Sequence, residues 1–293
     1  MQTIDKVKAL LTGQVPSHRL WGEVWIGPDV NKSAGYDESL GGQIALRKYM
    51  GMDLIWLPVS RNGKYHTQGY RLFRPIDVRH AKESCDLFVG VVVDGPWQQL
   101  VDEMGFMNSI KMLSTDRKVF VNALNVKAQN AMTLVEESLT HGAKGVVVVD
   151  DLAGQAGPLL SPDDAGNLLS SFYARTVDII RRREALALFH SCGNIDKLIS
   201  MIAVAGFHGL AAVQTYLLML DKIARQFTSP HLIVAGLDFG RNNLPVKKQI
   251  MIDHIKEIEK KSPLILSTSS GIHSWEQASH LIEIYGILTK ITV

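Results

Sequence analysis

The sequence predicts an α/β protein folded as a single (β/α)8 barrel, a TIM barrel, that spans residues 1–293. Apolar runs alternate with helical segments along the whole chain, eight such runs can be counted, and no linker rich in Pro, Gly or Ser separates them. Several runs are almost continuous Val, Ile and Leu, which is typical of strands buried on both faces. A doubly wound open sheet is the alternative, but no G-x-G-x-x-G motif follows the first run.

The eight apolar runs give the predicted strands. A barrel of this kind takes about 250 residues, so one barrel accounts for a chain of 293 residues. The predicted strands are Leu20–Ile26, Asp53–Val59, Leu87–Val93, Lys144–Val149, Ala185–His190, Gly209–Val213, His231–Ala235 and Leu264–Ser267.

Glycines mark where several helices end and strands begin. Gly51, Gly142 and Gly206 each stand three residues before an apolar run. Glycine just past a helix adopts the left-handed conformation that ends the helix without steric cost. The pattern therefore predicts a short helix-to-strand connection that is used three times.

Two helices have clear sequence signals. The apolar run 119–124 resembles a strand, but apolar residues continue beyond it at helical spacing, and Asp116 and the two hydroxyl residues before it suit an N-cap. We therefore predict a helix over Thr115–His141. A second helix is predicted to begin at Ser161, where a serine cap precedes Pro162 and two acidic residues that favour the positive end of the helix dipole.

Composition excludes several classes of function. A formal net charge of +2 provides no basic surface for nucleic acid. No apolar run reaches the roughly 18 residues that a membrane span needs, and the first residues lack the apolar core of a signal peptide. With only Cys85 and Cys192, a disulfide framework is not expected. We expect a cytoplasmic protein with neither nucleic acid nor membrane as a partner.

The strongest chemical signal lies where the fifth predicted strand ends. His190 and Cys192 stand two positions apart and therefore project from the same face of an extended chain. Imidazole nitrogen and thiolate sulfur are both zinc ligands. In α/β barrels, the residues at the C-terminal ends of the strands carry the chemistry. The alternative is a buried His and a buried Cys that only pack.

The other strand ends predict an acidic, hydroxyl-rich pocket. Of the adjacent Asp150 and Asp151, at most one can point into it. Such a pocket suits a divalent metal, or a cationic or neutral substrate, better than a polyanion. Arg61 and Arg241 are the nearest arginines, and each is expected on the surface. The remaining polar groups at the strand ends are Glu23, Trp25, Asp94, Gln214, Asp238 and Ser267–Gly271.

These motifs together resemble the uroporphyrinogen decarboxylase superfamily, over nearly the whole chain from the helix before Val15 and Pro16 to the last helix, which begins near Ser274. The resemblance is carried by Asp150-Asp151-Leu-Ala-Gly-Gln, by Ser161-Pro162 and by His190-Ser-Cys192-Gly193-Asn194. The His-x-Cys-Gly motif resembles the cobamide-dependent methyltransferase branch, such as the methylcobamide:coenzyme M enzymes. The decarboxylase's arginine-rich N-terminal motif, and its aspartate after the second strand, are missing from the matching stretches 20–25 and 54–58.

The resemblance implies a barrel like those of uroporphyrinogen decarboxylase and methionine synthase, and a zinc site. Methyltransferases of this branch take a third zinc ligand, a cysteine, from the loop after the last strand. Ser270 stands at that position here. A carboxylate or His273 must then complete the site, or zinc binding is weak or lost. The possible carboxylates are Glu23, Asp150, Asp151 and Asp238.

We therefore predict an enzyme that moves a methyl group to or from a corrinoid, with zinc held by His190 and Cys192. The chain has no Asp-x-His-x-x-Gly motif, so the corrinoid is expected on a separate protein, with a small-molecule methyl donor or acceptor as the other substrate. A monomer or homodimer is expected. The alternatives are a decarboxylase-like lyase acting on a tetrapyrrole and a metal-free barrel that binds a corrinoid or pterin. We assign Asp150, Asp151, Gln214 and Asp238 to catalysis, and Glu23, Trp25, Gln155 and Ser270 to cofactor binding.

Overall fold

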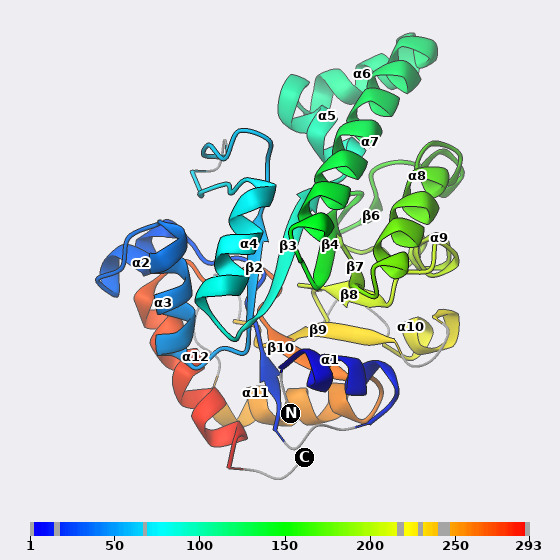
Figure 1. The fold of residues 1–293 in the computed structure, drawn as a ribbon. Helices are drawn as coiled ribbons and strands as arrows, with labels where there is room; N and C mark the ends of the chain where they lie inside the picture. Colours follow the sequence, from blue (N-terminus) through cyan, green and yellow to red (C-terminus); the bar gives the residue numbers. More distant parts are fainter. Residues whose placement is uncertain are drawn as a thin grey trace.

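Eight parallel strands form the centre of the molecule and helices surround them (Figure 1). The structure is a computed structural model that describes residues 3–14, 18–66, 69–215, 220–227, 231–239 and 247–290. Val15, Pro16 and Arg241 lie outside these ranges. The strands are hydrogen-bonded in the order β1, β10, β9, β8, β7, β4, β3, β2. Their bounds are β1 Leu20–Trp21, β2 Leu54–Pro58, β3 Phe88–Asp94, β4 Gly145–Val149, β7 Leu186–His190, β8 Gly209–Ala211, β9 Leu232–Gly236 and β10 Leu264–Ser267.

Asp53 closes the ring between the first and last strands of this order. Its backbone N–H donates to the carbonyl of Trp21 at 2.8 Å, and its carboxylate accepts from the backbone N–H of Trp21 at 3.1 Å. A Cβ atom on Gly22 would lie 2.5 Å from the Cβ of Leu54, so the glycine allows the chain after β1 to approach β2 closely. The predicted (β/α)8 barrel is confirmed.

The first strand is shorter than the predicted Leu20–Ile26. Only Leu20 and Trp21 belong to the ladder, and Ile26 makes an isolated bridge to Ile272. The ladder stops because the backbone N–H of Thr268 donates to the carboxylate of Glu23, at 3.0 and 3.1 Å, instead of to a carbonyl of the neighbouring strand.

The helices pack around the sheet, and three of them end where the glycines indicated. Gly51, Gly142 and Gly206 have φ angles of 81°, 100° and 90°, as expected for glycines at helix ends. Ser161 accepts a hydrogen bond from the backbone N–H of Asp164 and caps the helix that follows. The helices are α1 Thr3–Leu11, α2 Pro28–Ser33, α3 Leu40–Met50, α4 Pro75–Ser84, α5 Pro96–Met104, α6 Phe106–Thr115, α7 Arg117–Thr140, α8 Pro162–Arg182, α9 Ile199–Val204, α10 Leu220–Gln226, α11 Lys248–Glu259 and α12 Trp275–Leu288.

Two segments depart from a simple alternation of strand and helix. Between β3 and β4 the chain makes three helices, of which α5, α6 and one end of α7 extend beyond the sheet (Figure 1). Helix α7 begins after Asp116, whose carboxylate accepts from the backbone N–H of Val119, so the predicted helix over 115–141 is confirmed. After β4, a small hairpin forms from β5 Ala153–Gly154 and β6 Gly157–Pro158.

The barrel interior is filled by apolar side chains below the mouth. Trp56 is fully buried there, and Gly90 makes room for it because a Cβ at that position would lie 2.2 Å from the indole ring. Val7 and Leu10 of α1 belong to the same interior cluster. The packed interior separates the C-terminal ends of the strands, where barrels of this kind carry their chemistry, from the opposite end. Within the described ranges, no helix combines the length and apolar character that crossing a membrane would require.

Candidate functional site

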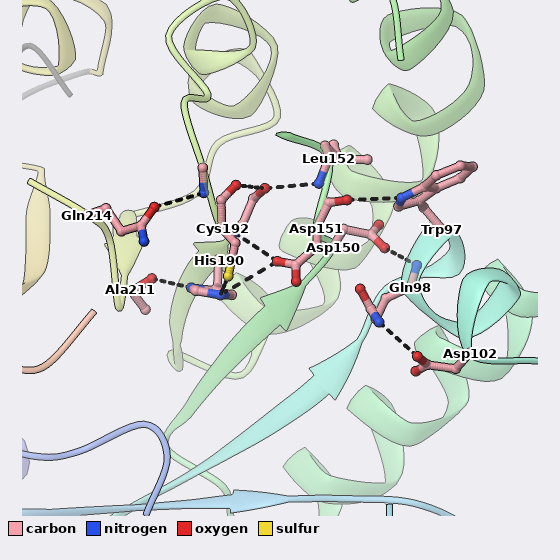
Figure 2. Close-up of polar contacts among 12 residues, drawn as sticks. Trp97, Gln98, Asp102, Asp150, Asp151, Leu152, His190, Cys192, Ala211 and Gln214 are labelled. Atoms are coloured by element: carbon pink, nitrogen blue, oxygen red, sulfur yellow. Dashed lines mark hydrogen bonds and ion pairs between the residues drawn. The ribbon is translucent and has the colours of Figure 1, made fainter. Parts of the chain in front are cut away.

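Three potential metal ligands converge at the C-terminal ends of β4 and β7. The Nε2 atom of His190 lies 3.6 Å from the Sγ atom of Cys192 and 3.7 Å from an Oδ1 atom of Asp151. One ligand atom from each residue lies within 4.8 Å of the other two. Figure 2 shows the three side chains pointing toward one another. The structure thus brings together the predicted metal pair and one of the predicted catalytic acids.

The register of the sheet produces this convergence. Val149 of β4 pairs with His190 of β7, and Asp151 and Cys192 each follow two residues later. The backbone N–H of Cys192 donates to Oδ1 of Asp151 at 2.8 Å, which joins the two strand ends. Parallel pairing therefore places the acid beside the thiol.

A backbone hydrogen bond fixes the orientation of the His190 ring. Its Nδ1 atom lies 2.8 Å from the carbonyl oxygen of Ala211, and since a carbonyl can only accept, Nδ1 carries the hydrogen. The lone pair of Nε2 then faces Asp151 and Cys192. This is the arrangement by which proteins hold metal-binding histidines, with the second ring nitrogen bonded to an oxygen.

Gly193 turns the chain after Cys192 in a conformation that suits glycine. Its φ is 79°, and a Cβ atom would lie 2.6 Å from the carbonyl oxygens of Ala153 and Gly154. Its backbone N–H donates to the Oε1 atom of Gln214 at 3.1 Å. The glycine of the His-x-Cys-Gly motif therefore allows the loop to pack against the β5–β6 hairpin.

The thiol of Cys192 stays protonated unless a cation is present. Burial, followed by the nearby negative charge of Asp151, raises its pKa to about 12. A bound metal ion reverses this effect because it favours the thiolate over the thiol. The donor set, one imidazole, one thiol and one carboxylate, consists of three groups that bind zinc.

The three side chains open into a cavity of about 270 Å³ at the mouth of the barrel. Its apolar wall is formed mainly by valines from several strands, and its polar wall by Asp94, Gln98 and the imidazoles of His66 and His273. Trp25 and Tyr70 provide two aromatic rings that meet edge to face at 6.0 Å between centroids. The cavity has room for a small molecule and is lined on one side by acids.

Comparisons with known proteins give the family. A sequence profile described as uroporphyrinogen decarboxylase (URO-D) matches residues 77–274. The chain belongs to the uroporphyrinogen decarboxylase family. The predicted superfamily is therefore confirmed. A search of curated protein sequences found no match.

Solved structures with the same fold include proteins of different chemistry. A methyltransferase from Methanosarcina mazei superposes with a TM-score of 0.77 at 15% identity, covering 98% of this chain and 99% of that one. A B12-independent methionine synthase from Shewanella sp. W3-18-1, in complex with selenomethionine, gives 0.58 at 10% identity, with 93% and 94% covered. A sugar phosphate isomerase/epimerase from Parabacteroides distasonis gives 0.55 at 10% identity, with 93% and 98% covered.

In this member of the uroporphyrinogen decarboxylase family, the two adjacent acids lie in different surroundings. Asp151 lines the cavity, whereas Asp150 is fully buried beneath it and is not part of the lining. Asp150 accepts from the backbone N–H of Gln98 and from the hydroxyl of Tyr173, both at 2.7 Å. Burial raises its pKa to about 8. The expectation that at most one of the pair enters the pocket agrees with the structure.

Glu23 is buried rather than open to the cavity. Its carboxylate accepts from the indole N–H of Trp21 at 2.8 Å and from the hydroxyl of Thr268 at 2.7 Å. Burial raises its pKa. It joins β1 to the residue after β10, and the described lining of the cavity does not include it.

The other predicted site residues fall into two groups. Trp25 and Ser270 line the cavity. Three others lie outside the described lining: Gln214 supports the Gly193 loop, Asp238 accepts from the backbone N–H of Ser269, and Gln155 is exposed at the turn of the β5–β6 hairpin. Of the two arginines named from the sequence, Arg61 is exposed and Arg241 is outside the described residues.

Sequence reasoning missed one side of the cavity. His66 and Tyr70 come from the long loop between β2 and α4, and their rings stack with centroids 4.5 Å apart. Asp102 of α5 approaches His66, with 3.3 Å between Oδ2 and Nε2. The only available signal was the length of the loop, since long loops in compact domains often carry function.

Proposed function

We propose that this protein is a methyltransferase that moves a methyl group to or from a corrinoid carried by a separate protein, with zinc held by Asp151, His190 and Cys192. The observation that carries the proposal is the convergence of these three ligand atoms at the barrel mouth. The neighbours named above support the class of reaction, since one is described as a methyltransferase and one as a methionine synthase.

The distances suit a shared zinc ion. Zinc binds imidazole nitrogen at about 2.0–2.1 Å and thiolate sulfur at about 2.3 Å, so two such ligands at a tetrahedral angle lie about 3.6 Å apart. Nε2 of His190 and Sγ of Cys192 are separated by 3.6 Å. Related methyltransferases have a cysteine ligand at the position of Ser270, and here Asp151 would supply the third ligand atom instead. Three protein ligands leave one coordination position of zinc open, as in catalytic zinc sites.

When bound, the metal would lower the pKa of a thiol placed at the open position and so favour the nucleophilic thiolate. The protein's own groups prepare the site for this. Ala211 holds the His190 ring with Nε2 directed inward. Asp151 offers a negative charge to the metal while it accepts from the backbone of Cys192. The valines and Trp25 of the wall limit the water that can surround a reacting group.

The corrinoid is proposed on a partner because the chain contains no Asp-x-His-x-x-Gly motif. We also propose a cytoplasmic location, where thiols such as Cys192 remain reduced. The decarboxylase-like alternative has less support. No Lys or Arg is among the described residues that line the cavity, whereas the carboxylates of a tetrapyrrole substrate are recognised by such cations.

Metal content and methyl transfer test the proposal together. Purified without a His-tag, the wild type should contain about one zinc per chain, and Cys192→Ser should bind zinc at least about 100-fold more weakly, because a hydroxyl replaces a thiolate. With zinc bound, the wild type should demethylate methylcobalamin in the presence of 2-mercaptoethanol.

Cys85→Ser is the matched control, since Cys85 precedes β3 and its thiol donates to the carbonyl of Ala81, away from the cavity. It should retain zinc and activity. Negligible zinc affinity in the wild type, or equal affinity in Cys192→Ser and the wild type, would contradict the proposed site. A metal-free binding barrel would then be the better description.

A further inference from the structure

A second group of titratable side chains lines the cavity on the side of β3 and α5. One ring nitrogen of His66 and one carboxylate oxygen each of Asp94 and Asp102 lie within 4.8 Å of one another. Figure 2 shows Gln98 and Asp102 to one side of the Asp151–His190–Cys192 cluster. Because Asp94 and His66 share the cavity with that cluster, one small ligand can contact both groups.

Two members of this second group contact each other. His66 and Asp102 lie 3.3 Å apart, and this contact raises the pKa of His66. The second carboxylate oxygen of Asp102 accepts from the side-chain amide of Gln98 at 2.9 Å. Asp102 therefore has two partners within the protein before any ligand binds.

Asp94 differs because its carboxylate has no hydrogen-bond donor within the described part of the chain, although its backbone carbonyl accepts from Gln99. Burial raises its pKa to about 6, so the group is largely ionised at neutral pH in spite of its surroundings. Asp94 is only partly buried, so its carboxylate is open to the cavity and can accept from a bound molecule.

The charge of the cavity favours a cationic ligand. The described lining contains the carboxylates of Asp94 and Asp151 and the imidazoles of His66, His190 and His273, but neither Lys nor Arg. Zinc, if bound by Asp151 and Cys192, would be neutralised by those two anions, and His66 is paired with Asp102, so Asp94 is the carboxylate left for a cationic ligand. An anionic ligand such as a sulfonate would meet repulsion there.

Aromatic rings adjoin the same group. The Tyr70 ring stacks on His66, and its pKa is raised by burial and by the nearby charges of Asp94, Asp102 and Asp151. Trp25 lies against Tyr70. The face of such a ring attracts an ammonium group and can add to the attraction of a carboxylate partner.

We propose that the small-molecule methyl acceptor is a thiol that carries a positively charged amine, with the ammonium group bound by Asp94 beside Tyr70 and the sulfur directed to Asp151, His190 and Cys192. This inference rests on the function proposed above and names its substrate class. The small cavity favours a short chain between sulfur and nitrogen.

Three thiols of similar size test this charge preference: 2-aminoethanethiol, 2-mercaptoethanol and 2-mercaptoethanesulfonate. Binding to the zinc-loaded protein is measured by titration calorimetry for the wild type and for Asp94→Asn. The variant should weaken the aminothiol about tenfold, because a charge-assisted hydrogen bond is lost. It should leave the neutral thiol unchanged and strengthen the sulfonate. Comparing each thiol between the two proteins cancels differences in thiol acidity.

Two controls keep the result independent of folding and of zinc. Asp178→Asn changes an exposed acid on α8 and should bind all three thiols as the wild type does. Asp94→Asn should unfold at the same temperature as the wild type or at a higher one, which shows that the variant is folded. Propylammonium, which has no sulfur, is titrated by ligand-observed NMR against the wild type and both variants. Its binding should be lost only in Asp94→Asn.

The outcomes separate the two proposals. If all thiols bind both proteins equally and propylammonium does not distinguish them, the ammonium site is wrong and the thiol site stands. If no thiol binds but propylammonium distinguishes Asp94→Asn, the cation site stands and the proposed methyl transfer to a thiol fails. The inference would also be overturned if the wild type bound the sulfonate more tightly than the aminothiol and Asp94→Asn had the same affinities for both.

Discussion

Asp150 and Asp151 are adjacent in sequence but differ in surroundings at the scale of single residues. Both were assigned to catalysis from their position after a strand. Asp151 lines the cavity, and its Oδ1 atom lies 3.7 Å from Nε2 of His190. Asp150 is fully buried, and its carboxylate accepts hydrogen bonds from the backbone N–H of Gln98 and the hydroxyl of Tyr173. Alternation of side chains along an extended segment explains the difference, since neighbours point to opposite sides.

This difference predicts the effect of amide substitutions on zinc binding. Asp151→Asn should weaken zinc affinity by about 10- to 100-fold, because an amide is a poorer ligand than a carboxylate. Asp150→Asn should leave zinc affinity within about threefold of the wild type and act mainly on stability. Competition with a chelator measures both variants. If the two substitutions lower zinc affinity equally, Asp151 is not the third ligand.

At the scale of elements, the barrel is closed by few contacts between β1 and β2. Asp53 contributes to this closure, because its carboxylate accepts from the backbone N–H of Trp21 and from the hydroxyl of Tyr285 on α12, and it also lies 3.1 Å from His18. The sequence predicted that a strand begins at this residue after Gly51. It did not reveal that the same residue joins three elements, because its partners are distant in sequence.

Loss of the Asp53 carboxylate should therefore lower stability more than a typical surface substitution. Asp53→Ala should reduce the free energy of unfolding by about 2–4 kcal/mol, since the backbone N–H of Trp21 loses its acceptor and the contacts with Tyr285 and His18 are removed. Tyr285→Phe removes only one of these hydrogen bonds and should cost about 1 kcal/mol. Denaturation by urea measures both. A loss in Asp53→Ala no greater than that in Tyr285→Phe would show that the carboxylate does not hold the ring closed.

At the scale of the whole molecule, buried ionisable groups make stability depend on pH in opposite directions. Burial, followed by the charge of Arg181, lowers the pKa of His208 to about 4, and its Nδ1 accepts from the backbone N–H of Ala187. The unfolded chain then binds a proton that the folded protein does not, so this group lowers stability as pH falls from about 6.5 to 4. Asp94, with a pKa raised to about 6, has the opposite sign.

His208→Asn isolates the histidine contribution. The amide oxygen can accept the same hydrogen bond but does not titrate, so the variant should lose less stability than the wild type between pH 6.5 and 4. Above pH 7 the difference between the two proteins should be constant. Urea unfolding at a series of pH values gives both curves. Parallel curves over the whole range would mean that His208 does not remain neutral in the folded protein.

The starts of the strands, the glycines that end helices, the helix over 115–141 and the family could be predicted from the sequence, because these depend on local periodicity, backbone conformation and a short motif. His190 and Cys192 could be predicted as a pair, since both belong to one strand end. The early end of β1, the place of Asp151 beside that pair, the burial of Glu23 and the grouping of His66, Asp94 and Asp102 became visible only in the folded protein. Those contacts join residues far apart in the chain, and they arise from the register of paired strands and from the closure of the barrel.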